Sequence, residues 1–83
     1  MDTNIIKDIL KAHHINSAIL VEEEKICNII ICSMTSEMPF ERWDNLESLL
    51  KYCTKKEIQL SSYPQAKKYL KEDYLNKGVI INA

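Results

Sequence analysis

Residues 25–33, Lys-Ile-Cys-Asn-Ile-Ile-Ile-Cys-Ser, are rich in β-branched side chains and carry apolar groups on both faces of an extended chain. The apolar residues of this stretch are Ile26, Cys27, Ile29, Ile30, Ile31 and Cys32. Asn28 interrupts one of the two faces. A strand that is apolar on both faces is typical of the middle of a sheet. We therefore expect residues 25–33 to have a strand neighbour on each side.

The segments on either side of residues 25–33 predict those two neighbours. Residues 17–22 form a preceding β-branched strand, joined through an acidic hairpin loop, and residues 57–62 alternate between apolar and polar as a third strand. A helix that runs to about residue 53, with Pro39 suited to its first turn, connects the second strand to the third. The right-handed crossover rule places the third strand parallel to the second, so the predicted sheet order is 1-2-3.

Two further helices are predicted, one before and one after this βαβ unit. Residues 4–14 have a helical apolar stripe, and residues 62–65 have the form of a capping box that opens a helix to residue 76 or 77. Gly78 is placed as the C-terminal cap of that helix, and residues 79–82 are a short strand or an extended tail. We thus expect residues 1–83 to form one small α/β domain of the α+β type, with a mixed three-stranded sheet packed by helices.

The composition is that of an ordinary globular protein, with 46% hydrophobic and 28% charged residues. We expect no signal peptide and no membrane span, because no apolar run approaches about 18 residues. The three cysteines, Cys27, Cys32 and Cys53, are odd in number and lack close CxxC spacing, which argues against a disulfide framework or a zinc site. Free thiols fit a reducing compartment, so we predict a cytoplasmic protein.

The chain has a single glycine, Gly78, and this scarcity excludes the glycine-rich loops that bind nucleotide phosphates. Phosphate-binding loops need several glycines so that backbone amides can approach the phosphate. His13 and His14 are adjacent on a predicted helix and diverge by about 100°, so they cannot chelate one ion together. No Cys, Ser and His grouping indicates a catalytic triad. We therefore predict no catalytic residue, no cofactor and no metal site.

The order helix, hairpin, helix, strand, helix, short strand resembles a minimal nucleotidyltransferase domain of the polymerase β superfamily. Residues 74–81, Tyr-Leu-Asn-Lys-Gly-Val-Ile-Ile, are similar to the closing helix and tail of that family. Residues 26–32 are placed like the family strand that carries a pair of aspartates. In functional members, a Gly-Ser loop, this aspartate pair and a third carboxylate hold two metal ions and a triphosphate.

The residues that this resemblance needs are missing at the matching positions. Residues 22–25 replace the Gly-Ser loop, Ile26 and Asn28 take the places of the two aspartates, and Gln59 takes the place of the third carboxylate. Isoleucine cannot bind magnesium, and amides are poor substitutes for anionic ligands. The resemblance therefore implies a catalytically inactive relative.

Two surfaces are candidates for contact with a partner. Strand alternation places Ile26, Asn28, Ile30 and Gln59 on one sheet face, which is left uncovered if the helices lie mainly on the other face. The second surface comes from charge: residues 1–50 hold four basic and nine acidic side chains, whereas residues 51–83 hold seven basic and three acidic ones. The candidate partner-facing residues are Ile26, Asn28, Ile30, Gln59, Lys67 and Lys71.

These observations favour a non-catalytic protein-interaction module that acts through self-association or through a partner protein. A homodimer packed through the open sheet face or an edge strand is one form of this hypothesis. One alternative is a nucleotidyltransferase-type nucleotide-binding protein. The other is a binder of nucleic acid or of an acidic protein that uses the basic C-terminal half; the net charge of −1 and the single arginine, Arg42, weigh against the nucleic-acid form.

Overall fold

The strand predicted at the middle of the sheet, β2, does have a strand on each side. The structure is a computed structural model, and it describes residues 3–70 and 72–82. Its elements are α1 (Thr3–Ala12), β1 (Ile15–Glu22), β2 (Ile26–Met34), α2 (Phe40–Thr54), β3 (Glu57–Ser62), α3 (Tyr63–Tyr69), α4 (Glu72–Asn76) and β4 (Val79–Asn82). β1 pairs with β2 in antiparallel fashion, and β3 pairs with β2 in parallel, as predicted.

The sheet has one strand more than predicted among the described residues. β4 pairs antiparallel with β1, so the strand order is β3-β2-β1-β4 instead of a three-stranded 1-2-3. Ile81 is buried on β4, whereas Val79 and Ile80 are exposed. A four-residue segment with one buried position has too short a pattern to separate a paired strand from an extended tail.

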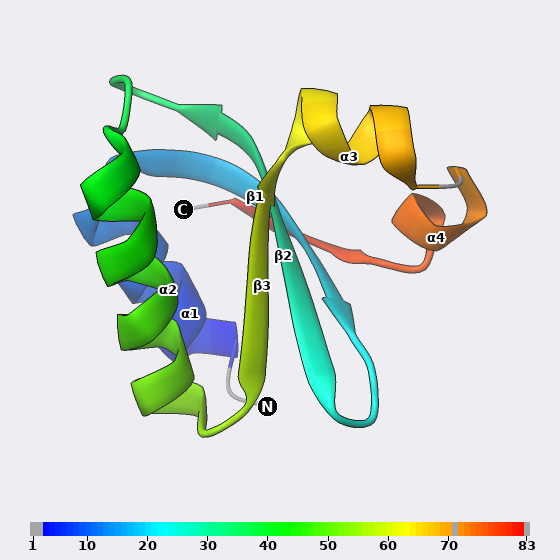
Figure 1. Ribbon diagram of the computed structural model, residues 1–83, viewed down its shortest axis with the longest axis horizontal. Helices are drawn as coiled ribbons and strands as arrows, with labels where there is room; N and C mark the ends of the chain where they lie inside the picture. The colour runs from blue at the N-terminus through cyan, green and yellow to red at the C-terminus, as the bar shows by residue number, and fades with distance from the viewer. Residues whose placement is uncertain (1–2, 71, 83) are drawn as a thin grey trace.

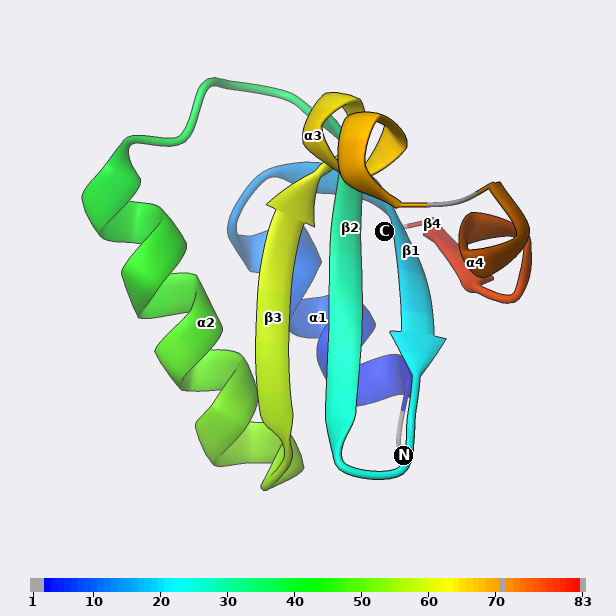
Figure 2. The same ribbon diagram turned by 45° about the vertical axis from the view of Figure 1, so that its right-hand side comes forward.

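Helices α1 and α2 cover one face of the sheet (Figures 1 and 2). The core on this side includes Ile6 and Leu10 of α1, Leu46 and Leu50 of α2, and Cys27, Ile29 and Ile31 of β2. Each fully buried aliphatic side chain of this kind contributes about 1.5–3 kcal/mol relative to an exposed one. This face therefore holds most of the stabilising apolar burial.

Helices α3 and α4 lie on the other face, where α3 crosses the end of β2 and β3 and α4 lies beside β1, so they cover this face in part (Figure 2). The predicted single helix is two helices, because Leu70 takes extended dihedral angles, φ −105° and ψ 147°. The break allows Leu70 and Tyr74 to pack on one cluster with Ile30 of β2 and Ala66 of α3. α3 also begins without the predicted capping box, since Ser62 makes no side-chain cap hydrogen bond.

No helix in the described part of the chain combines the length and the apolarity needed to cross a membrane.

Gly78 is needed for a reason other than the predicted helix cap. Its φ is not positive, so the backbone conformation does not require glycine. A Cβ atom at this position would instead lie 2.2 Å from Cγ2 of Ile19 and 3.2 Å from the carbonyl oxygen of Leu20. The chain therefore passes so close to β1 just before β4 that a side chain here would force Ile19 or the backbone to shift.

We expect Gly78→Ala to lower the free energy of unfolding by about 1–3 kcal/mol, because the added methyl group overpacks the contact with β1. Chemical denaturation measures this change. Lys77→Ala is the matched control, because Lys77 is an exposed neighbour and should leave stability almost unchanged. Equal stability of Gly78→Ala and the parent chain would contradict the close approach.

Candidate functional site

The main candidate site is a groove between helix α2 and strand β3, with a volume of about 300 Å³. We call it the edge groove. It is lined by Phe40, Trp43, Asp44, Glu47, Leu60, Ser61, Ser62 and Gln65. Figure 2 shows α2 running beside β3 along this side of the sheet.

The floor of the edge groove is formed by the second half of an edge strand. β3 has one strand neighbour, β2, so its backbone groups that point away from β2 have no strand partner among residues 3–70 and 72–82. The register of β3 with β2 is continuous, without a bulge. Residues 58–62 carry neither a charge nor a proline, the usual devices that stop an edge strand from pairing with another chain.

Two aromatic side chains from α2 form the wall of the edge groove. Phe40, at the first position of α2, is 79% exposed although it lies against the groove. Trp43, one turn later, packs partly against the main core, and its Nε1 donates a hydrogen bond to the carbonyl oxygen of Met38 at 3.1 Å. The indole ring is thus held in place, whereas the phenyl ring is open to contact.

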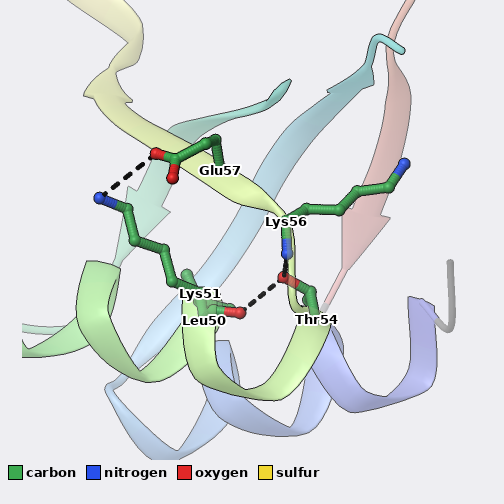
Figure 3. Close-up of polar contacts among 5 residues, drawn as sticks. All are labelled: Leu50, Lys51, Thr54, Lys56 and Glu57. Carbon is green, nitrogen blue, oxygen red and sulfur yellow. Dashed lines mark hydrogen bonds and ion pairs between the residues drawn. The ribbon is translucent and has the colours of Figure 1, made fainter. Parts of the chain in front are cut away.

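The charge of the edge groove is negative. Asp44 and Glu47 lie on its α2 wall, and none of the described lining residues is Lys, Arg or His. Lys51 lies one turn beyond Glu47 on α2. Its Nζ is 3.8 Å from Oε2 of Glu57 at the start of β3 (Figure 3). This lysine is paired with Glu57, whereas Asp44 is exposed and Glu47 is half-buried in the groove lining.

The turn from α2 to β3 joins the helix that forms the wall of the edge groove to the strand that forms its floor (Figure 3). Thr54 Oγ1 donates to the carbonyl oxygen of Leu50 at 2.7 Å and accepts a hydrogen bond from the backbone N of Lys56 at 3.4 Å. Lys55 adopts a left-handed φ of 58° as the helix ends. Nζ of Lys56 also pairs with Glu22 at the end of β1, and this hydrogen bond lowers the pKa of Glu22.

A second hollow of about 290 Å³ lies on the opposite face of the same strand. We call it the amide hollow. It is lined by Asn28, Gln59, Ser61, Gln65, Ala66, Tyr69 and Leu70. Ser61 and Gln65 line both the edge groove and the amide hollow, so the two hollows flank the end of β3.

Two of the residues predicted as a partner-facing set meet in the amide hollow. Asn28 and Gln59 are register partners on β2 and β3. Asn28, however, has a structural contact: its Nδ2 donates a hydrogen bond to Oη of Tyr74 and so ties β2 to α4. The pKa of Tyr74 is raised mainly by burial and, to a smaller extent, by the nearby Glu23 carboxylate.

The other predicted residues do not join this pair. Ile30 is fully buried beneath α3, so the face expected to be uncovered is covered at Ile30, whereas Gln59 on the same face is exposed. Ile26 is half-buried at the start of β2. Lys67 is exposed and lines a separate hollow between α3 and α4, and Lys71 lies outside the described residues.

Among the described residues, the acidic, histidine and cysteine side chains do not gather into a metal site. Within residues 3–70 and 72–82, no group of three or more of them could hold an ion. His13 donates from Nδ1 to the carbonyl oxygen of Ile9 at 2.9 Å, whereas His14 follows the helix with a left-handed φ of 63°. All three cysteines are free thiols, and burial raises the pKa of Cys27 to about 11.

No family model matches the chain, and it matches neither a curated protein nor a solved structure. The resemblance to a nucleotidyltransferase domain therefore stays a prediction. The edge groove is not predicted from the sequence, and none of the predicted partner-facing residues lines it. A signal was present, because the predicted order 1-2-3 already placed the third strand at an edge and next to the aromatic start of the preceding helix.

We expect Cys27 to resist alkylation by iodoacetamide in the native protein at about pH 8, because its thiol is buried and protonated and the thiolate is the reactive form. Cys53, which is exposed, should react and serves as the internal control. Peptide mass spectrometry reads both sites. Equal labelling of the two cysteines without denaturant would contradict the burial of Cys27.

Tyr74→Phe should lower the free energy of unfolding by about 0.5–1.5 kcal/mol, because Asn28 loses its hydrogen-bond acceptor. Thermal or urea denaturation measures the change. Tyr52→Phe is the control, since Tyr52 is 81% exposed and should tolerate the loss of its hydroxyl group. If Tyr74→Phe were as stable as the parent chain, Asn28 would not tie β2 to α4.

Proposed function

We propose that this chain is a non-catalytic protein-interaction module that binds a partner protein in the edge groove. The observation that carries the proposal is the open, charge-free stretch 58–62 of β3 beside the exposed ring of Phe40. Edge strands with these properties are templates for pairing with another chain. Aromatic side chains at such a position are typical of residues that contribute strongly to binding energy.

The other edge of the sheet supports the proposal less well. β4 exposes Val79 and Ile80, but it has only four residues, and shortness is itself a common protection of an edge. The hollow beside it is lined mainly by β4 and by the first turns of α1. The longer β3, which has a hollow on each face, offers more contact to a partner.

A second copy of the chain fits the edge groove poorly. A two-fold pairing of two β3 strands would bring the same α2 wall from each copy to the seam. A pairing centred on the end of β3 that lines the groove would bring Asp44 and Glu47 of the two copies together, and like charges placed opposite each other are destabilising. A partner protein of different charge is therefore favoured over the homodimer.

The alternative functions have less support. A nucleotide-binding role would need phosphate or metal ligands, and Asn28 in the amide hollow is already bonded to Tyr74. A nucleic-acid role would rest on Lys67, which is exposed on α3, and on Lys71, which lies outside the described residues. The free cysteines support a reducing compartment, so the cytoplasm is the proposed place of action.

Selection from a displayed library of random linear peptides tests the proposed function. Peptides selected on the parent chain should bind Phe40→Ala about tenfold more weakly, which is the cost of losing a central aromatic contact. Tyr52→Ala is the matched control, because it removes an equally exposed aromatic ring of α2 that does not line the groove. Trp43, the single tryptophan, reports binding through its fluorescence.

The proposal is overturned if no selected peptide distinguishes Phe40→Ala from the parent chain. Binding that is lost in Tyr52→Ala but kept in Phe40→Ala would place the interaction on another face of α2. Light scattering of the free protein provides the check on self-association: a monomer is expected, and a stable dimer would contradict the choice of a partner protein.

A further inference from the structure

We infer that the edge groove takes an extended segment of the partner that adds to β3 as a further strand and carries Lys or Arg at alternate positions. This inference rests on the proposed function and adds to it the conformation and the charge of the ligand. Addition of a strand to a sheet edge gives affinity through main-chain hydrogen bonds, and pockets for alternate side chains give specificity.

The backbone of β3 fits this binding mode. Its six residues span about 20 Å, enough for a partner segment of similar length. Its pairing with β2 is continuous from the register pair Ile26 and Glu57 to the pair Ile31 and Ser62. The outer side of β3 therefore presents a regular row of donors and acceptors, without the bulge that would twist an edge away from a partner.

The two hollows are placed as an added strand requires. Successive side chains of a strand point to opposite faces of the sheet. Side chains directed toward the α2 face would enter the edge groove, and the alternate ones would meet the amide hollow on the α3 face. Ser61 and Gln65 line both hollows, so one continuous extended segment can reach both. A helical ligand presents one face to a groove and would use only one of them.

The charge of the edge groove selects the side chains that face α2. Asp44 and Glu47 attract cations, and the neighbouring Lys51 is already paired with Glu57. Phe40 and Trp43 add ring faces, on which Lys and Arg bind favourably. The amide hollow is lined by neutral residues, so the alternate positions should carry neutral polar or small side chains.

Three capped synthetic peptides test the inference on the full chain. The first alternates lysine and threonine, the second alternates glutamate and threonine, and the third has the lysines and threonines of the first in two separate blocks. Trp43 fluorescence should show binding of the first peptide and at least tenfold weaker binding of the other two. The backbone amides of residues 58–62 that point away from β2 should gain protection from hydrogen exchange only with the first peptide.

The double variant Asp44→Asn/Glu47→Gln should bind the alternating lysine peptide about five-fold more weakly than the parent chain does. Added salt should also weaken binding of this peptide to the parent chain. Glu41→Gln is the matched control, since Glu41 is an exposed acid of α2 outside the groove lining. Equal binding of the lysine and glutamate peptides, or of the block peptide, would overturn the inference.

The outcomes separate this inference from the proposed function. If library peptides bind in a Phe40-dependent manner but lack alternating basic residues or leave the amides of β3 unprotected, the proposed function stands and the inference fails. If no peptide shows Phe40-dependent binding, the proposed function itself fails. If the amides of β3 become protected at high protein concentration without any peptide, the strand added to β3 comes from another copy of the chain, and the inference fails.

Discussion

The burial of β2 on both faces is the constraint on which the rest of the structure depends. Cys27 and Ile29 face the core beneath α1 and α2, whereas Ile30 faces the cluster beneath α3. A strand with apolar side chains on both faces must be covered on both, so the chain needs two layers of helices and a strand on each side of β2. The position of β3 at an edge and that of α2 beside it follow from this arrangement.

The two edge strands of the sheet, β4 and β3, differ in length and in how accessible their outer sides are. β4 is short and lies near the start of α1, which limits how much of its backbone another chain can reach. β3 is longer, and the helix that precedes it leaves a groove along its outer side instead of covering it. An open edge favours aggregation unless something limits what can pair with it. In the proposed function, the carboxylates of Asp44 and Glu47 would supply such a limit, because negative charge at the groove disfavours acidic chains.

Much of the fold could be predicted because its signals are local. The β-branched run of residues 26–32, the hairpin and the βαβ connection gave the three main strands and their directions. The signals that failed involve contacts between distant segments. The break at Leu70 and the pairing of β4 depend on how α4 meets β1 and β2, and Gly78 is needed because of Ile19, which lies far away in the sequence.

The candidate site was predicted only in part for the same reason. Strand alternation correctly brought Asn28 and Gln59 together, but it could not reveal that Tyr74 bonds to Asn28 or that α3 covers Ile30. The groove forms because α2 lies beside, not over, the outer side of β3, and this placement depends on the tertiary packing of Leu46 and Leu50. Residue patterns along the chain do not contain that information.

Hydrogen exchange of the free protein, followed residue by residue by NMR, tests the open edge most directly. In a strand with one neighbour, only the amides that point toward that neighbour are protected. Residues 58–62 should therefore alternate between slow and fast exchange, while the amides of β2 are slow throughout its paired length. Uniform protection along residues 58–62 in a monomer would mean that another part of the chain covers β3, and the groove would then not be a binding site.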